Sequence, residues 1–186
     1  MKQDYFRMTR EKWEAEYVRG QWNYIKQLDE LARYSVIVGY CCYFRPGGTI
    51  LDIGCGEGIL QERLSPCQYS RYVGIDICAE AIRRALPKQD EKTFFIRADA
   101  STYNPEERFD IIVFNECLYY FEDSLSILRR YERFLNQDGI FVASMRVTEM
   151  TVDIWKVLEA VCLTKDRVTV SNQSGEAWII KIFTLQ

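Results

Sequence analysis

The segment Ile50-Leu51-Asp52-Ile53-Gly54-Cys55-Gly56-Glu57-Gly58 has the residue types of a buried strand that turns through glycines into a helix. Glycines at such a junction let the backbone turn tightly and approach a ligand closely, where a Cβ would obstruct it. The pattern therefore predicts a ligand-binding turn at the end of the first strand of a sheet.

Asp52 narrows the choice of ligand for this turn. A carboxylate there would crowd a pyrophosphate that seeks the positive end of the helix dipole, and the spacing is GxGxG instead of the GxGxxG of dinucleotide sites. A ligand that carries an ammonium and a sulfonium would be attracted to the same carboxylate. S-adenosylmethionine is such a ligand. We therefore expect its site to be lined by Asp52, Gly54, Cys55 and Gly56, with the cysteine filling a small space beside the ligand.

Two further carboxylates follow predicted strands, at the edge where ligands bind in an open α/β sheet. Asp76 can accept both ribose hydroxyl hydrogens, or it can cap the helix that follows. Asp99 can accept a hydrogen bond from an adenine amino group while Ala100 supplies a backbone N–H, or Asp99 can simply begin a turn. Ile77 is expected to contact the adenine ring. These residues predict a nucleoside site beside the glycine turn.

The elements that must position these residues alternate along the chain. The residue pattern predicts strands at 49–53, 72–76, 94–97, 109–115, 140–145, 168–170 and 178–183. It predicts helices at 59–64, 80–86, 124–135 and 154–161. This alternation is typical of an α/β fold with a doubly wound, mostly parallel sheet and helices on both faces.

The N-terminal region, residues 1–45, is rich in aromatic side chains. A set of large residues recurs there at helical spacing: Trp13, Tyr17, Tyr24, Leu28 and Leu31. The spacing predicts one amphipathic helical face that packs on the sheet. A turn then leads into the first strand, as indicated by Arg45-Pro46-Gly47-Gly48.

Length and composition limit the class of protein. The 186 residues fit one domain, and the net charge of −3 disfavours general nucleic-acid binding. The seven cysteines lack CxxC spacing, which favours reduced thiols in a cytoplasmic protein, and the pair Cys41-Cys42 has no obvious partner.

The sequence contains neither a secretory segment nor an apolar run long enough to span a bilayer, so a soluble protein is expected. The absence of histidine excludes an imidazole zinc site and a histidine base, and no metal is expected.

On these residues, the segment from about Gly48 to Met145 resembles a class I S-adenosylmethionine-dependent methyltransferase, through Leu51-Asp52-Ile53-Gly54-Cys55-Gly56-Glu57-Gly58 and the later acidic residues. The run Leu118-Tyr119-Tyr120 with Glu122-Asp123 resembles the nodulation-type N-methyltransferases. The resemblance implies a three-layer α/β/α Rossmann-like methyltransferase fold with a seven-stranded sheet and a C-terminal antiparallel hairpin. It also implies that S-adenosylmethionine is the cofactor and S-adenosylhomocysteine its product. The expected parts are an N-terminal helical lid (1–45), a donor-binding core (46–145) and a C-terminal helix and hairpin (146–186).

The end of the fourth strand should carry the reacting groups. The resemblance places Asn115 against the methionine part of the donor, through its backbone carbonyl. Tyr120, Tyr119 and Glu116 are the candidate catalytic residues. A tyrosine with a pKa near ~10 is a poor base, and both tyrosines can equally well seal the pocket by packing. Glu116 can hold a cationic amine or cap the following turn.

The resulting hypothesis is an enzyme that methylates a small-molecule acceptor, mainly by proximity and orientation. Nitrogen is slightly favoured over oxygen, because a hydroxyl needs a base more than an amine does and no histidine is present. The expected acceptor pocket consists of Trp13, Tyr17, Tyr24, Tyr119, Tyr120 and Arg146, with Trp155 near its mouth. The alternatives are a methyltransferase for a protein or RNA and a noncatalytic binding subunit with the same fold. The sequence leaves the acceptor and the oligomeric state open.

Overall fold

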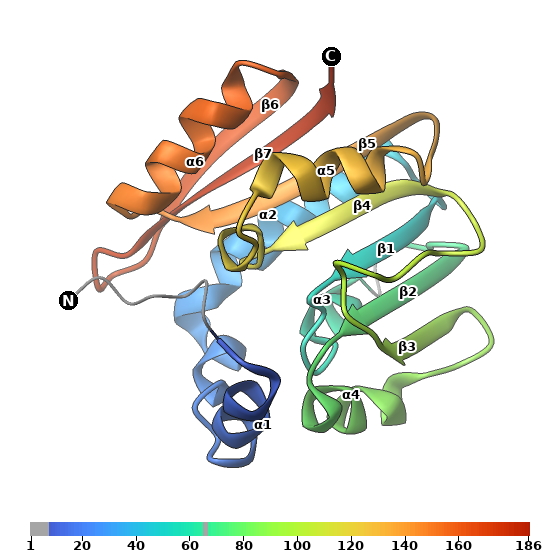
Figure 1. Cartoon of the computed structure of the whole chain (residues 1–186), viewed down its shortest axis with the longest axis vertical. Helices are drawn as coiled ribbons and strands as arrows, with labels where there is room; N and C mark the ends of the chain where they lie inside the picture. Colours follow the sequence, from blue (N-terminus) through green and yellow to red (C-terminus); the bar gives the residue numbers. More distant parts are fainter. Residues whose placement is uncertain (1–7, 65–66) are drawn as a thin grey trace.

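A computed structural model describes residues 8–64 and 67–186, which form a seven-stranded sheet in the order β3-β2-β1-β4-β5-β7-β6 (Figure 1). The strands are β1 (Thr49–Ile53), β2 (Arg71–Asp76), β3 (Thr93–Arg97), β4 (Phe109–Asn115), β5 (Leu135–Arg146), β6 (Cys162–Ser171) and β7 (Ala177–Leu185). β1 to β5 pair in parallel, and β7 pairs antiparallel with both β5 and β6. The predicted mostly parallel sheet with a closing antiparallel hairpin is confirmed.

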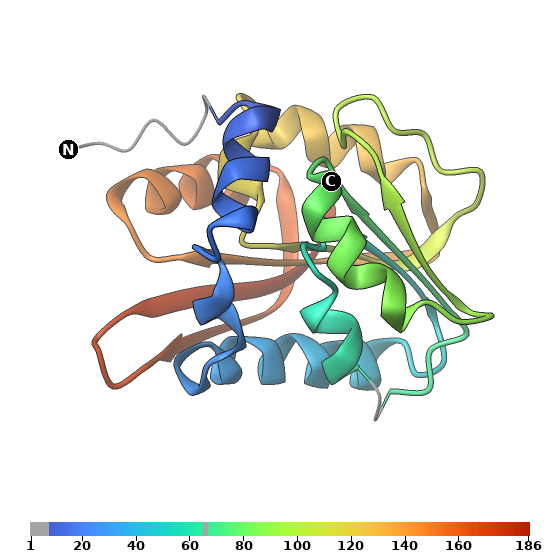
Figure 2. The ribbon, with the colours of Figure 1, turned by 90° about the horizontal axis from the view of Figure 1, so that it is seen from below.

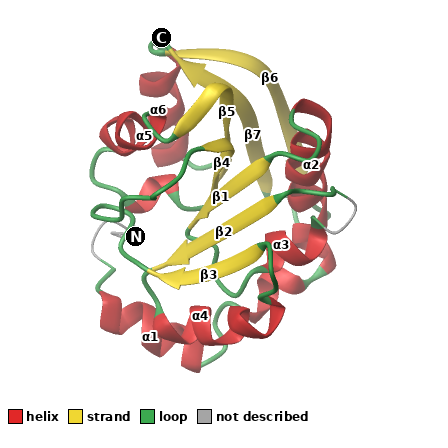
Figure 3. Ribbon diagram, turned by 90° about the vertical axis from the view of Figure 1, so that its right-hand side faces the viewer, coloured by secondary structure: helices red, strands yellow, loops and turns green. Residues whose placement is uncertain are grey.

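Helices cover both faces of this sheet, as predicted (Figure 3). One face carries α2 (Leu28–Phe44), α3 (Ile59–Arg63) and α4 (Ala79–Ala85), and the other carries α5 (Ser124–Glu132) and α6 (Glu149–Glu159). Successive strand residues point to opposite faces, so Ile50 and Leu51 of β1 belong to different cores. In β4 the run from Ile111 to Phe114 is fully buried, as a strand covered on both faces requires.

The chain reverses its direction across the sheet between β1 and β4. β1 leads through α3 to β2, whereas the neighbouring β4 leads through α5 to β5. In open α/β sheets a crevice for ligands forms outside the carboxyl ends of the strands at such a switch point. Helix α1 (Arg10–Val18) lies over the carboxyl ends of these strands, beside α4 (Figure 2).

The predicted single helical face of the N-terminal region is wrong. The chain breaks into α1, the short 3-10 helix η2 (Asn23–Lys26) and α2, which begins at Leu28. Leu28 and Leu31, which were expected to pack on the sheet, are exposed. Residues 1–7 of the expected lid lie outside the described residues.

Gly20 is the physical cause of this break. It adopts a left-handed backbone with φ +72, which glycine reaches without a Cβ penalty. Its N–H donates to the Tyr17 carbonyl at 3.0 Å, and the N–H of Gln21 donates to the Glu16 carbonyl at 3.0 Å. These two bonds form a Schellman cap, which ends α1 at Val18.

The carboxyl-terminal elements agree with the prediction except at their ends. β5 begins at Leu135, so it includes the residues 136–139 that were expected to form a separate turn. α6 ends at Glu159, before Val161. Trp155 is 4% exposed and packs edge-on against Phe183, with ring centroids 6.4 Å apart. Its expected position near the acceptor mouth is therefore wrong, because its face of α6 points into the core.

The expectation that all cysteines are reduced is also wrong. Cys42, near the end of α2, forms a disulfide with Cys67, and their Cα atoms lie 5.1 Å apart. This spacing is in the range that a disulfide needs. The sequence did not reveal the pair because it depends on how α2 packs beside the chain that follows α3. The cysteine pattern consequently no longer argues for a reducing compartment.

Candidate active site

A cavity of about 700 Å³ opens at the carboxyl ends of the first five strands. Its lining includes every residue that the sequence predicts for donor, catalysis and acceptor: Asp52, Gly54, Cys55, Gly56, Asp76, Ile77, Asp99, Ala100, Asn115, Glu116, Tyr119, Tyr120, Trp13, Tyr17, Tyr24 and Arg146. The structure thus brings the predicted site together in one place. It leaves the role of each residue to be inferred from its contacts.

The glycine turn forms one wall of the cavity. Gly54 and Gly56 have φ values of +69 and +56, a backbone that other residues rarely adopt. A Cβ on Gly56 would lie 2.7 Å from the Tyr17 hydroxyl oxygen, and one on Gly54 would lie 3.0 Å from the Cβ of Cys117. Both glycines are therefore required by backbone shape and by close packing. Tyr17, predicted for the acceptor pocket, lies against this turn.

Asp76 ends β2 and contacts the turn directly. Its Oδ2 accepts the N–H of Gly56 at 2.9 Å, and its Oδ1 accepts the N–H of Cys78 at 2.8 Å. Burial raises the pKa of Asp76 to about 6, although the two backbone hydrogen bonds favour the ionised form. Each carboxylate oxygen retains a second acceptor direction for a ligand hydroxyl. Asp76 thus both organises the start of α4 and presents acceptors to the cavity.

Asp52 is 1% exposed and also faces the cavity. Its Oδ2 accepts the hydroxyl of Tyr72 at 2.5 Å, whereas its Oδ1 has no hydrogen-bond partner among the described residues. Burial raises the pKa of Asp52 to about 7, and the Tyr72 hydrogen bond offsets part of this rise. A buried hydrogen-bond acceptor without a donor destabilises the fold. A cationic group of a ligand would supply the missing partner for this oxygen.

We expect Asp52→Asn to stabilise the ligand-free protein at alkaline pH. The folded-state pKa of about 7 lies above the unfolded value, so the folded protein binds the extra proton and the Asp52 contribution to stability falls as pH rises from about 4 to 7. The variant should gain about 2–4 kcal/mol at pH 8 and almost nothing at pH 4. Urea unfolding at both pH values measures this difference. An equal difference at the two pH values would contradict the buried-charge explanation.

The predicted adenine end lies beyond β3. The Asp99 carboxylate accepts the N–H of Ser101 at 2.8 Å, so the turn-forming interpretation of this residue holds. The Ala100 carbonyl accepts the Tyr131 hydroxyl at 2.9 Å, which fixes the backbone of this wall. Asp99, Ala100 and Ile77 all face the cavity. Their contact with an adenine ring stays a prediction.

Arg33 of α2 is a cavity residue that sequence reasoning missed. It is 2% exposed, and its guanidinium lies 4.5 Å over the Tyr34 ring. Nη2 donates to Glu30 Oε2 at 2.7 Å, and Nη1 donates to the Asn115 side-chain oxygen. That oxygen also accepts the Ser144 hydroxyl at 2.8 Å. The sequence does contain a signal for Arg33. It forms an i, i+3 pair of opposite charges with Glu30 within an otherwise apolar helix face.

Glu116, directly after β4, is held in an unusual position. It is a non-glycine residue with φ 57, and its carboxylate faces the cavity. Oε1 accepts the Ser144 hydroxyl at 3.2 Å, and Oε2 accepts the Tyr119 hydroxyl and the Arg146 N–H, each at 3.2 Å. Burial raises the pKa of Glu116, and the positive charge of Arg33 opposes the rise. These three hydrogen-bond donors lie on β5 and on the Tyr119 side chain. They therefore give no support to the alternative in which Glu116 caps the backbone of the following turn.

Aromatic rings line the same cavity as Glu116, and the Tyr119 hydroxyl contacts its carboxylate. The Tyr119 and Tyr120 ring centroids lie 4.5 Å apart, and Trp13 meets Tyr120 edge-on at 4.7 Å. Trp22 packs on Trp13 at 5.3 Å. Tyr24 also lines the cavity and is 46% exposed. A carboxylate beside aromatic faces is an arrangement that binds ammonium groups.

The basic side chains at this end of the cavity are neutralised. Arg146 forms an ion pair with Glu176, and Arg33 pairs with Glu30. No lysine or arginine in residues 8–64 and 67–186 forms an ion pair with Glu116. The negative charge of Glu116 is therefore left without an ion-pair partner at the predicted acceptor end.

Two features are missing from the described part of the chain, residues 8–64 and 67–186. No group of three or more histidine, cysteine, aspartate or glutamate side chains there could hold a metal ion. No helix there has both the length and the apolar character needed to cross a bilayer.

The profile of a family described as "Methyltransferase domain" matches residues 11–163. Nodulation protein S of Sinorhizobium fredii is 33% identical over 101 residues, which are 53% of this chain and 46% of that protein. An mRNA cap guanine-N(7) methyltransferase of Cryptococcus neoformans is 26% identical over 139 residues, which are 64% of this chain and 22% of that protein. The chain thus spans less than half the length of either relative.

Solved structures share the fold over most of the chain. The N-methyltransferase NodS from Bradyrhizobium japonicum, in complex with S-adenosyl-L-homocysteine, has a TM-score of 0.75 and 23% identity, and covers 88% of this chain and 91% of its own. Magnesium protoporphyrin IX methyltransferase from Synechocystis, with bound SAM, has a TM-score of 0.77 and 15% identity, and covers 98% of both chains. At these identities the likeness shows the fold.

Proposed function

The chain belongs to the methyltransferase-domain family, whose methyl donor is S-adenosylmethionine, and on this basis we propose that it methylates an amine nitrogen of a small molecule. The membership confirms the family resemblance and the donor predicted from the glycine turn. The acceptor and the roles of the individual residues belong to the proposal. The observation that carries it is the Glu116 carboxylate, which faces the cavity among aromatic rings without an ion-pair partner in the described residues.

The polar groups on one side of the cavity fit the donor. Asp76 offers acceptors for two ribose hydroxyls, and the free Oδ1 of Asp52 offers an acceptor for a cationic group. The glycine turn leaves room for the nucleoside, because Gly54 and Gly56 carry no Cβ. Asp99 and Ala100 close the far end, where the adenine would lie.

The amino-acid end of the donor would lie near Arg33. Its guanidinium lines the cavity, and its buried Nε has no hydrogen-bond partner among the described residues. Because Glu30 already accepts from Nη2, Nε is the guanidinium N–H left for the donor carboxylate. The ammonium of the same ligand would meet the backbone carbonyl of Asn115. Arg33 also fixes this strand end through the Asn115 side chain.

Glu116 would hold the acceptor amine and take its proton. S-adenosylmethionine, when bound, supplies a methyl carbon made electrophilic by the adjacent sulfonium. The amine attacks through its lone pair, so its ammonium form must first lose a proton, and Glu116, which lines the cavity, would receive it. Trp13, Tyr119 and Tyr120 would exclude water and orient the nitrogen. Orientation of this kind supplies on the order of 7–11 kcal/mol in favourable cases.

A methyl-transfer assay with matched acceptors tests this proposal. The purified protein and isotopically labelled S-adenosylmethionine would be incubated with a primary alkylamine that carries an aromatic ring, and with the alcohol and carboxylate of the same carbon skeleton. Capped RNA and a protein mixture would be the remaining arms. We expect label in the amine alone. Label in the alcohol or in RNA would contradict the amine assignment, and label in none of them would favour a noncatalytic subunit.

A further inference from the structure

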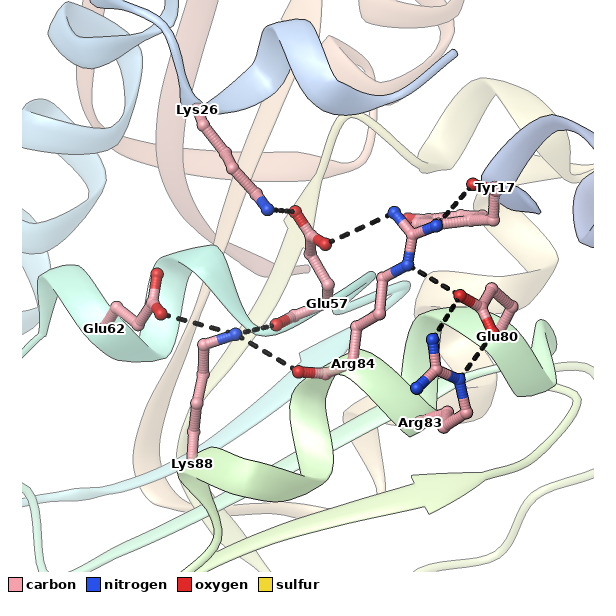
Figure 4. Close-up of polar contacts among 8 residues, drawn as sticks. All are labelled: Tyr17, Lys26, Glu57, Glu62, Glu80, Arg83, Arg84 and Lys88. Carbon is pink, nitrogen blue, oxygen red and sulfur yellow. Dashed lines mark hydrogen bonds and ion pairs between the residues drawn. The ribbon is translucent and has the colours of Figure 1, made fainter. Parts of the chain in front are cut away.

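Glu57 belongs to the glycine turn but does not line the cavity. It lies between Gly56 and Gly58, whose φ values are +56 and +80, and it is 3% exposed. Its side chain lies between Lys26 and Arg84 (Figure 4). The cavity lining includes Gly54 and Gly56 but not Glu57. Burying a carboxylate costs folding free energy unless a positive charge or a hydrogen-bond donor pairs with it. The partners of Glu57 therefore indicate its role.

The partners of Glu57 come from two other segments. Lys26 of η2 approaches Oε1 to 2.7 Å, and Arg84 of α4 approaches Oε2 to 3.8 Å (Figure 4). Lys88, just after α4, donates to the Glu57 backbone carbonyl at 2.6 Å. Glu57 therefore connects the glycine turn with the N-terminal segment on one side and with α4 on the other.

The N-terminal segment covers the cavity. We call residues 8–27, which include α1 and η2, the cover. Six residues of the cover line the cavity: Met8, Trp13, Tyr17, Trp22, Tyr24 and Ile25. A ligand buried beneath these side chains enters or leaves when the cover moves aside.

The cover is held on α4 largely by polar contacts. Arg84 donates to the Tyr17 carbonyl at 2.7 Å. The Glu14 carboxylate accepts the N–H groups of Ala79 and Glu80 at 2.6 and 3.0 Å. The apolar part of the contact has a buried core of Tyr17, Cys78 and Ala81, against which Trp13 and Trp22 pack. The polar contacts can break and reform in water.

We propose that Glu57 is a positioning residue that fastens the cover to the donor-binding turn through Lys26, and that breaking this ion pair limits how fast the donor site opens. The Lys26 side chain is 54% exposed, so it can leave into water, whereas Glu57 keeps Arg84 when the cover moves. Because Lys26 is exposed, salt weakens the pair: the screening length falls from about 10 Å at 0.1 M to about 3 Å at 1 M.

The dissociation rate of S-adenosylhomocysteine measures the opening. Stopped-flow displacement can follow it through the fluorescence of Trp13 and Trp22, which lie in the cover. We expect Lys26→Met and Glu57→Gln each to raise this rate about fivefold, as the loss of a partly exposed ion pair implies, and the double variant to raise it no further. In the wild type the rate should rise with salt, and in both single variants this salt dependence should largely disappear.

Glu62→Gln is the matched control. Glu62 pairs with Lys88 at 3.3 Å in the same cluster but does not touch the cover (Figure 4). The variant should therefore release S-adenosylhomocysteine at the wild-type rate and with the wild-type salt dependence. Wild-type kinetics in Lys26→Met, whose replaced side chain is half-exposed, would overturn the proposal even if Glu57→Gln failed to fold. Failure of the folded wild type to bind S-adenosylhomocysteine would instead contradict the donor site itself.

Discussion

Replacement of Asp76 by alanine is expected to weaken the binding of S-adenosylhomocysteine about 100-fold or more. Two hydroxyl hydrogen bonds to one carboxylate account for this loss, because each charge-assisted bond contributes about 1.5–3 kcal/mol. The variant also loses the acceptors for the N–H groups of Gly56 and Cys78, so the turn itself becomes less well ordered. Titration calorimetry on the wild type and the variant measures the change.

Asp153→Ala is a suitable control for this experiment. Asp153 is a carboxylate on α6 whose side chain is 72% exposed and pairs with Lys156, remote from the cavity. Its removal should leave the dissociation constant unchanged. Circular dichroism should show that Asp76→Ala keeps the wild-type secondary structure. An unchanged dissociation constant in a folded Asp76→Ala variant would remove the ribose assignment.

Glu116→Gln is expected to lower kcat for an amine acceptor about 100-fold or more, since a positioned proton acceptor contributes about 10²–10⁴-fold. Glutamine retains the shape of the side chain, and its single amide oxygen can accept either the Ser144 hydroxyl or the Tyr119 hydroxyl and the Arg146 N–H. The donor should bind the variant as it binds the wild type. Steady-state kinetics with separate determination of kcat and KM, together with calorimetry of the donor, test this.

The pH dependence separates a proton-accepting role from a structural one. Burial raises the pKa of Glu116, and its carboxylate accepts a proton only when ionised. Wild-type kcat/KM should therefore fall as pH drops through this raised pKa, and the variant should lose this dependence. Glu122→Gln, an exposed glutamate in the same loop, should behave as the wild type. A Glu116→Gln variant with wild-type turnover and an unchanged pH profile would show that Glu116 takes no part in the reaction.

The parts of the structure that local sequence determines could be predicted. The glycine turn, the strand lengths and the polar residues at the strand ends follow from backbone preference and from the two-residue period of buried strands. β1 and β4 were predicted with their observed bounds for this reason. Because parallel strands present their carboxyl ends at one edge, these predictions also placed Asp52, Asp76 and Asn115 in one cavity.

Features that depend on packing between distant segments could not be predicted. Arg33 reaches Asn115 across 82 positions of the chain, and the disulfide joins Cys42 to Cys67 only because α2 lies beside the end of α3. Glu57 resembles any polar turn residue until Lys26 and Arg84 are seen beside it. The break after α1 is different, because Gly20 is a typical helix-ending residue and its left-handed backbone overrides the helical spacing of the aromatic side chains.

A crystal structure with S-adenosylhomocysteine tests the central claim most directly. The account predicts that the ribose hydroxyls lie within hydrogen-bond distance of the Asp76 carboxylate. It also predicts that the sulfur faces the part of the cavity bounded by Glu116, Tyr119 and Tyr120. A ligand whose ribose lies elsewhere, or whose sulfur points away from Glu116, would contradict both the donor site and the proposed transfer to an amine.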